Sequence, residues 1–420
     1  MFNQKHRLYT AIVSQHFVVD MFNGVAGVIL AALALPLAIS NAQVGLTLTL
    51  YALAGALTQP FFGWLADRLP DHAKGLRPTP LLLTSVAVIW MAGMSIGVAL
   101  LAGSWAMLLL FLVLGALGSG LFHPIGTSQA ANSYHGSINT GTAMFFFIGQ
   151  MGFAVGPFLG GVLFTVFGQG GIALMGLIAL LPVTLLLISR NDPQPGAARN
   201  RLANAGTTDW AAIRRSLMSF SVLAFLVLVA LRSSIHAVYQ MLLPSFFAER
   251  GWEPAMYGLI TGVVIGTAAF GNVVIARLVD RYGLRLVVVL AMLGSVPASL
   301  LFLHSTALPI IFMAAAVSGT LVGGAHSVLV VQAQRLLPVK AGFASGIILG
   351  FIFASGALGT WLAGMIAEAY SFQVAMNVIV LFALPTAALA LTLPGRSVLP
   401  SSTPDSPAPT PTAPAQTSRV

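Results

Sequence analysis

Residues 79–102 read TPLLLTSVAVIWMAGMSIGVALLA and contain no Asp, Glu, Lys or Arg. An α-helix needs about 20 apolar residues to cross the hydrocarbon core of a bilayer, and this run is long enough. Similar runs recur along the chain of 420 residues, of which 57% are hydrophobic and 7% are charged. Too little polar surface remains for a soluble globule, and the continuous runs lack the alternation of a membrane β-barrel. We therefore expect an all-α membrane protein.

The apolar runs predict twelve transmembrane helices when each is read between polar, glycine or proline breaks. The predicted spans are 9–39, 44–67, 79–102, 105–130, 141–167, 171–189, 217–247, 255–279, 285–304, 307–333, 342–368 and 373–394.

The basic residues predict the orientation. If the spans alternate in direction, seventeen of the 19 Lys and Arg residues fall on the same side; Arg250 lies on the other side and Arg232 inside span seven. Cytoplasmic loops carry an excess of Lys and Arg. We therefore expect a multi-pass protein of the inner membrane with both termini in the cytoplasm, and we do not expect a nucleic acid partner despite the net charge of +9.

Two halves of the sequence repeat each other. The segment GWLADR at 63–68 matches ARLVDR at 276–281, and GPFLGG at 156–161 matches GTWLAG at 359–364, 203 residues later. These repeats predict six-helix halves at 1–189 and 217–394, a basic linker at 190–216 and a disordered tail at 395–420. Two such repeats place a solute site between them and allow rocking about it.

The loop signature after spans two and eight resembles that of the major facilitator superfamily. The resemblance implies two six-helix pseudo-repeats and a loop that latches the halves together on the cytoplasmic side. A plain positive-inside anchor is the alternative. The residues that carry the signature are Gly63, Asp67, Arg68, Asp280, Arg281 and Arg285.

Span five carries a second signature, GFAVGPFLGG at 152–161, which resembles that of drug:proton antiporters in this superfamily. Small residues four apart also let membrane helices pack closely, so a packing role is the alternative to a role in conformational change. The residues concerned are Gly152, Gly156, Pro157, Gly160 and Gly161.

A narrower resemblance is to the fosmidomycin-resistance branch of the superfamily. It is carried by HFVVD at 16–20, by QP at 59–60 and by FHP at 122–124. The span-four arginine of the superfamily's proton antiporters is missing, so any proton coupling must use other groups.

Charged groups inside predicted spans are costly and are therefore functional candidates. His16 and Asp20 share a helix face near the middle of span one, where we expect Asp20 to carry a proton with the help of His16. A structural hydrogen bond, for example to Asn23, is the alternative. Arg232 needs an anionic partner, either a substrate or Asp20 itself as a strut between the halves. His236 follows one turn later as a proton group or a hydrogen-bonding residue.

Other polar and aromatic residues are candidates for binding the solute. His123 and His326 occupy equivalent positions in spans four and ten. We expect them to bind substrate; a proton relay and a plain structural role as polar residues are the alternatives. Gln150 and Tyr239 are expected to line a cavity together with the aromatic run at 145–147, unless that run faces lipid or core.

Several chemistries have no support in the sequence. The chain has no cysteine, no phosphate-binding glycine loop and no metal-ligand spacing, so we expect no metal, cofactor or use of ATP. The string Gly93-Met-Ser95-Ile-Gly97 lies within a predicted span, which is the wrong context for a hydrolase nucleophile. The protein is therefore not expected to be an enzyme.

The predicted function is proton-coupled export of a small amphipathic or anionic compound by alternating access. The expected partners are the solute, protons and the lipid bilayer, and the protein is expected to work as a monomer. Uptake by symport or facilitation, and lipid flipping, remain open alternatives.

Overall fold

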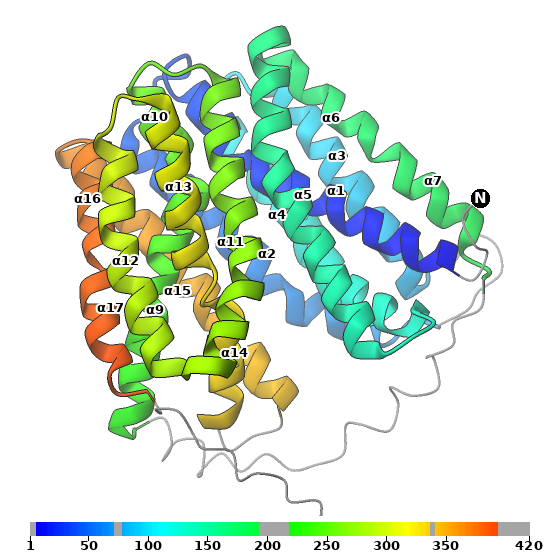
Figure 1. Cartoon of the computed structure of the whole chain (residues 1–420). Helices are drawn as coiled ribbons and strands as arrows, with labels where there is room; N and C mark the ends of the chain where they lie inside the picture. The colour runs from blue at the N-terminus through cyan, green and yellow to red at the C-terminus, as the bar shows by residue number, and fades with distance from the viewer. Residues whose placement is uncertain (1–5, 71–77, 193–217, 337–340, 394–420) are drawn as a thin grey trace, which may run out of the picture.

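The computed structural model describes residues 6–70, 78–192, 218–336 and 341–393 (Figure 1). Most of the predicted linker at 190–216 and the whole predicted tail at 395–420 lie outside these residues. The described residues form helices and loops, without a strand.

The N-terminal half consists of five long helices and a broken sixth span. They are α1 Arg7–Ala34, α2 Asn41–Ala66, α3 Pro80–Leu101, α4 Trp105–Ser133 and α5 Ile138–Phe167, then the 3₁₀ turn η2 Gly168–Gly171, α6 Ile172–Ile178 and α7 Leu180–Ser189.

The C-terminal half repeats this order. Its helices are α9 Phe220–Met241, α10 Leu243–Glu249, α11 Pro254–Tyr282, α12 Leu284–His304, α13 Leu308–Gly323, α14 His326–Leu336, α15 Ala341–Ala369, α16 Phe372–Leu381 and α17 Ala383–Ala390. Helices α13 and α15 begin 203 residues after α4 and α5, which is the offset of the sequence repeat.

Eleven apolar segments of the described chain are long enough to cross a membrane. One of them covers 50 residues, Thr140–Ser189, which is too long for a single crossing. It is broken at Gly168, where a φ of 62° reverses the chain between α5 and α6. Counting these two arms separately gives the twelve predicted spans.

Hydroxyl side chains fix where many of the spans begin. The first turn of a helix leaves backbone N–H groups without partners. Ser40 and Gln43 form a capping box at the start of α2, and the side chains of Thr79, Ser104 and Ser371 accept hydrogen bonds at the starts of α3, α4 and α16. The chain therefore enters its spans with these N–H groups satisfied.

The short inter-helical loops at 35–40, 102–104, 250–253, 305–307 and 370–371 gather at one end of the bundle, which we call the hairpin face. The opposite end, where α1 begins and α7 ends, is the terminal face. Figure 1 shows the helices of the two halves close together at the hairpin face and diverging toward the terminal face.

Two helix pairs hold the halves together, α2 with α15 and α5 with α11. Gly45 of α2 lies against Gly364 of α15, and Gly258 of α11 lies against Pro157 of α5, so closely that a side chain at either glycine would meet opposing backbone. All four residues belong to the hairpin-face parts of their helices.

In each of these pairs, a side chain of one half also caps the first turn of a helix in the other half. The backbone N–H of Ala42, in the first turn of α2, donates to a carboxylate oxygen of Glu368 at 3.2 Å. The N–H of Ala255, in the first turn of α11, donates to the hydroxyl of Thr165 at 3.0 Å. The halves are therefore closed against each other at the hairpin face.

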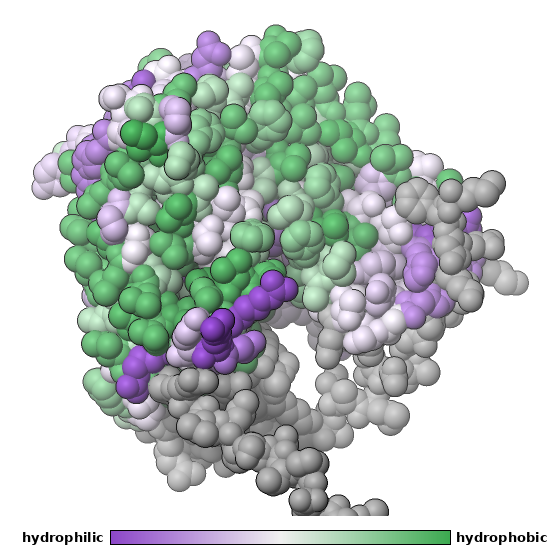
Figure 2. All heavy atoms as spheres, viewed as in Figure 1, coloured by the Kyte–Doolittle hydropathy of each residue, from purple (hydrophilic) through white to green (hydrophobic). Residues whose placement is uncertain are grey.

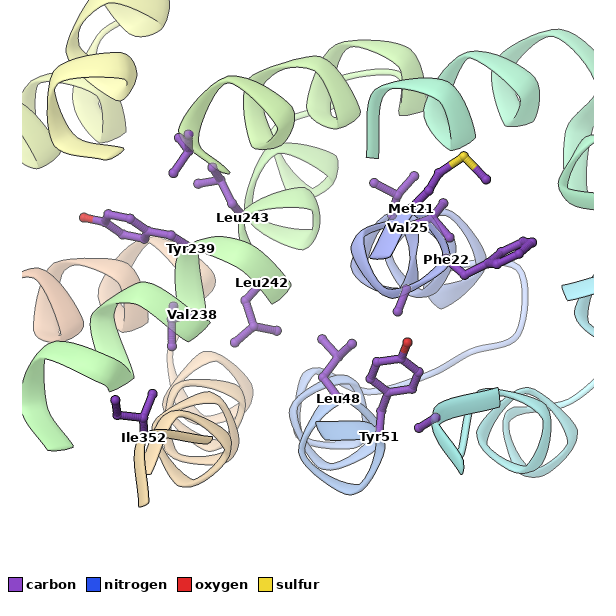
Figure 3. Packing of buried hydrophobic residues seen from close by; sticks show 14 of the residues in the cluster. Met21, Phe22, Val25, Leu48, Tyr51, Val238, Tyr239, Leu242, Leu243 and Ile352 are labelled. Atoms are coloured by element: carbon purple, nitrogen blue, oxygen red, sulfur yellow. The ribbon is translucent and has the colours of Figure 1, made fainter. Parts of the chain in front are cut away.

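The outer surface is that of a membrane protein. Figure 2 shows hydrophobic residues over the flanks of the helices and hydrophilic residues gathered toward the ends, with the surface hollowed between the halves at the terminal face. The interior is apolar as well: Met21, Phe22 and Val25 of α1 and Leu48 and Tyr51 of α2 belong to one buried cluster, in which Leu48 and Tyr51 point toward α1 and Met21 points away from α2 (Figure 3).

Candidate solute and proton site

Three ionisable side chains of the N-terminal half lie in direct contact. On α1, Nε2 of His16 lies 3.2 Å from Oδ2 of Asp20, as their spacing of four residues predicts. On α4, Nε2 of His123 lies 3.2 Å from Oδ1 of the same carboxylate. The exposed fractions of these side chains are 2% for His16, 8% for Asp20 and 22% for His123. We call these three residues the triad.

The other ring nitrogen of each histidine faces a backbone carbonyl. Nδ1 of His16 lies 2.8 Å from the carbonyl oxygen of Phe145, and Nδ1 of His123 lies 2.8 Å from that of Ser119. The His16 ring also stacks on the Phe145 ring, with centroids 3.8 Å apart. Gly149 leaves the space for this ring, because a Cβ there would collide with it. His16 is therefore held firmly between α1 and α5.

Asn23 connects the triad to neighbouring helices. Its amide nitrogen donates to Oδ1 of Asp20 and to the hydroxyl of Ser119, both at 3.0 Å. Its amide oxygen accepts a hydrogen bond of 2.7 Å from the hydroxyl of Tyr51 on α2. A buried carboxylate is tolerated only when donors replace its water, and Asn23 supplies one of them.

The triad offers three atoms of metal-ligand type within 4.8 Å of one another. The two imidazoles, however, contact different oxygens of Asp20, His16 touching Oδ2 and His123 touching Oδ1. This is how a carboxylate bridges two hydrogen-bond donors, whereas a single ion draws both nitrogens toward a common point. The arrangement is that of one carboxylate between two hydrogen-bonding imidazoles.

Arg232 of α9 binds backbone at a break in span ten. Its Nε donates to the carbonyl oxygen of Val322 at 2.9 Å, and Nη2 donates to that of Gly323 at 2.7 Å. These carbonyls end α13, where the helix leaves its last C=O groups without intrahelical partners. Arg232 is 1% exposed, and its guanidinium is thus the C-terminal cap of α13 and complements the dipole of that helix.

The pairing of Asp20 with Arg232 that the sequence left open is not formed. The contacts of Asp20 described above are with His16, Asn23 and His123. Those of Arg232 are with Val322, Gly323 and His326, all within its own half. The two charges are satisfied separately, so no Asp20–Arg232 strut joins the halves in this conformation.

Each half places a histidine beside a charged residue, and the charges of these two residues are opposite. His123 of α4 contacts Asp20 of α1, and its equivalent His326, at the start of α14, lies 3.5 Å from Nη1 of Arg232 on α9. His236 lies one turn beyond Arg232, near both of these groups, and is half-buried like His326. The N-terminal half therefore presents a carboxylate and the C-terminal half a guanidinium, each beside histidine.

The remaining candidates for solute binding lie in different surroundings. Gln150 is exposed on α5. Tyr239 is buried inside the C-terminal half with its ring 5.7 Å from that of Phe302, and Figure 3 shows it pointing away from α1 and α2. We therefore remove Tyr239 from the expected lining of the cavity. Of the aromatic run at 145–147, Phe145 is core, while Phe146 and Phe147 are exposed.

The loop signature makes contacts within each half. Arg68 donates to the carbonyl of Trp64 at 3.1 Å and lies over its ring, while Arg285 donates to the carbonyl of Leu393 at 2.7 Å. Arg281 lies over the ring of Tyr282. Gly63, Asp67 and Asp280 stand at the same ends of α2 and α11. This arrangement accords with halves that are apart at the terminal face, and a latch between them remains a prediction.

The span-five glycines face two directions. A Cβ at Gly152 or Gly156 would meet the backbone of α1, and one at Gly160 would meet Val25 of α1. Gly161, by contrast, lies against Pro254 of α11 in the other half. Packing thus explains most of the motif, and only its last part, with Pro157, borders the partner half.

Ser95 lies inside the continuous helix α3 and its hydroxyl donates to the carbonyl of Ile172 at 3.3 Å. This is ordinary helix packing and not the strand-to-helix turn that a hydrolase nucleophile requires.

The family model of the Major Facilitator Superfamily matches residues 12–253 and 229–419, which together cover nearly the whole chain. The chain belongs to this superfamily. It is therefore a transporter of small molecules and not an enzyme, and the predicted pair of six-helix repeats is confirmed.

Curated relatives agree with this assignment. The chain is 26% identical over 378 residues to the fosmidomycin resistance protein of Escherichia coli (strain K12), covering 88% of each chain. It is 24% identical over 362 residues to YfnC of Bacillus subtilis (strain 168), an uncharacterized MFS-type transporter, covering 84% of this chain and 85% of that protein.

Solved structures share the fold. A bacterial homologue of the human lysosomal transporter Spinster, in an inward-facing and unoccupied conformation, superposes with a TM-score of 0.73 at 18% identity, covering 93% of this chain and 97% of that one. A mutant of the nucleoside transporter NupG gives a TM-score of 0.73 at 14% identity, covering 93% of this chain and 100% of that one.

Sequence reasoning placed His123 apart from Asp20, because 103 residues separate them and only the packing of α4 on α1 brings them together. It also missed Tyr51, Ser119 and Gly149. No local pattern marks these residues, since each acts through a neighbour on another helix.

Proposed function

We propose that this transporter exports a small amphipathic or anionic solute from the cytoplasm in exchange for protons. The observation that carries the proposal is the Asp20 carboxylate, buried between the imidazoles of His16 and His123. Proton exchange needs a group that gains and loses a proton inside the membrane helices, and ionisable groups there are retained for such functions. His123 joins Asp20 and His16 as a proton group in this proposal.

The distribution of Lys and Arg supports a cytoplasmic terminal face in an inner membrane, with both termini on that side. The halves are closed at the hairpin face and diverge at the terminal face. In this conformation a cytoplasmic solute has access to the space between the halves, and rocking of the halves about it would release the solute outside.

The C-terminal half supplies the positive charge for an anionic solute. The hydrogen-bond partners of Arg232 described above are two carbonyl oxygens and a histidine, so no carboxylate among them cancels its charge. Because Arg232 itself is buried, we assign the contact with the solute to the half-buried His236 and His326, and to Gln150 across the space. The resistance named for the Escherichia coli relative makes fosmidomycin the first solute to test.

The test is solute accumulation in everted inner-membrane vesicles under an imposed pH gradient that is acid inside. Wild-type protein should accumulate fosmidomycin, or another inhibitor selected by growth protection, only while the gradient lasts. Asp20→Asn should abolish this accumulation, while Asp192→Asn, which removes a carboxylate that pairs with Arg7 at the terminal face, should not. Equal accumulation by the Asp20→Asn variant would exclude Asp20 from coupling. Accumulation driven by the opposite gradient would indicate symport.

A further inference from the structure

The hydrogen-bond geometry of the triad fixes the tautomer of both histidines. A carbonyl oxygen only accepts hydrogen bonds. Nδ1 of His16 and Nδ1 of His123 lie 2.8 Å from the carbonyl oxygens of Phe145 and Ser119, so each must carry a hydrogen. The hydroxyl of Ser119 also approaches Nδ1 of His123, but at 3.3 Å it is farther away than the carbonyl oxygen. A neutral imidazole has a single N–H, so each neutral ring would turn a bare lone pair of Nε2 toward Asp20.

Two lone pairs then face the carboxylate, each 3.2 Å from an oxygen that also carries lone pairs. Such a contact is attractive only when a proton lies between the two atoms. Two contacts require two protons in addition to the Nδ1 hydrogens. The closed triad therefore carries two shared protons and a net charge of +1, and removal of either proton turns one contact into a repulsion.

The two histidine rings differ in how freely they can move away from Asp20 when that repulsion arises. His16 is 2% exposed and fixed against Phe145, with Gly149 fitted around it. His123 is 22% exposed and is the most accessible member of the triad. Loss of a proton should therefore displace the ring of His123 and leave His16 in place.

We propose that His123 is the port through which protons enter and leave the triad, which alternates between a closed two-proton state and a one-proton state with His123 turned away. This inference rests on the proposed proton coupling. On release, the Nε2–H bond of His123 breaks, the proton passes to water between the halves, and its electron pair stays on Nε2. The second proton remains shared between His16 and Asp20.

The surroundings of the triad add few competing charges. The titratable groups facing Asp20 are His16 on its own helix, His123 on α4 and, through Asn23, the hydroxyl of Tyr51 on α2. Helix α5 contributes a carbonyl, and α3 contributes Ser85, which bonds Gln15 at 2.7 Å. On α9, Arg232 is bonded within its own half.

The first experiment reads the tautomer directly. Nitrogen NMR of histidine-labelled protein in bilayers, with the His123 signals assigned by their loss in His123→Asn, should show both nitrogens protonated at acid pH. At alkaline pH only Nδ1 should carry hydrogen. An Nε2–H tautomer at alkaline pH, or no change of protonation between about pH 5 and about pH 9, would overturn the proposal.

The second experiment counts protons released by purified full-length protein between the same pH values, using an indicator dye. Asn places its amide nitrogen near Nδ1 and preserves the bond to Ser119, whereas Gln reaches the position of Nε2 and preserves the contact with Asp20. Both variants should release one proton fewer per chain than wild type. Equal release by wild type and His123→Gln would show that His123 only positions Asp20, and thermal melting of each variant confirms folding.

The outcomes separate the two proposals. If Asp20→Asn transports normally while His123 shows the expected tautomer and proton count, the coupling role of Asp20 is wrong. The proposal that protons enter and leave the triad through His123 then still stands. If Asp20→Asn loses coupling and His123 stays neutral throughout, coupling stands and the port is wrong.

Discussion

The guanidinium of Arg232 donates a hydrogen bond of 2.7 Å to the carbonyl oxygen of Gly323, the residue that ends α13. The span breaks there and resumes at His326 as α14. An irregular backbone at membrane depth needs donors from protein, because lipid supplies none. A residue expected to hold a substrate or an acidic partner is thus first of all part of the C-terminal half's own architecture.

Replacing Arg232 with Gln should destabilise the protein by about 2 to 5 kcal/mol, because two buried carbonyls lose their donors. We expect thermal melting in detergent to fall by several degrees, and less for Arg232→Lys, which keeps the charge but not the fork of donors. Arg277→Gln, at an exposed site on α11, is the matched control. Similar melting of Arg232→Gln and Arg277→Gln would contradict the capping role.

Replacing Glu368 with Gln should loosen the hairpin face. The carboxylate caps the first turn of α2 across the two halves, and a charge-assisted bond is roughly twice as strong as a neutral one. The chain has no cysteine, so a Thr49→Cys variant carries a single label site inside this interface. Labelling by an impermeant maleimide added on the side of the hairpin face should become several-fold faster when Glu368→Gln is added. An unchanged rate would show that the helix packing alone keeps this face closed.

Gly152→Ala should lower stability by about 1 to 3 kcal/mol, because the added Cβ meets the backbone of α1 at Phe17 and must push two helices apart. Gly93→Ala, where the added Cβ has no neighbour within 4 Å, is expected to melt like wild type. Gly161→Ala should instead act between the halves, since its neighbour is Pro254, and should speed the labelling of Thr49→Cys. Equal melting of Gly152→Ala and Gly93→Ala would remove the packing role.

Tyr51→Phe should cost about 0.5 to 1.5 kcal/mol, because the amide oxygen of Asn23 loses its donor beside Asp20. Tyr257→Phe is the control: its hydroxyl is buried without a hydrogen-bond partner among the described residues, so its removal should be neutral or stabilising. Denaturation midpoints of the two variants measure the difference. A Tyr51→Phe variant as stable as Tyr257→Phe would mean that Asn23 does not depend on this bond.

The spans were predictable because a bilayer imposes a length and an apolar composition that can be read along the chain without knowledge of any contact. The predicted span 171–189 and the observed α6 and α7 agree closely, and the offset of 203 recurs in the starts of α13 and α15. The contact between His16 and Asp20 was equally accessible, since helix geometry alone brings residues four apart together.

By itself, the sequence determined the spans, their division into two repeats and the position of each charge along a helix, all of which follow from local periodicity and burial in lipid. Only the tertiary structure decided which of those charges meet. It placed His123 against Asp20 and Arg232 against the carbonyls that end α13, because contacts between distant segments depend on how whole helices pack. No pattern within a single helix encodes that choice.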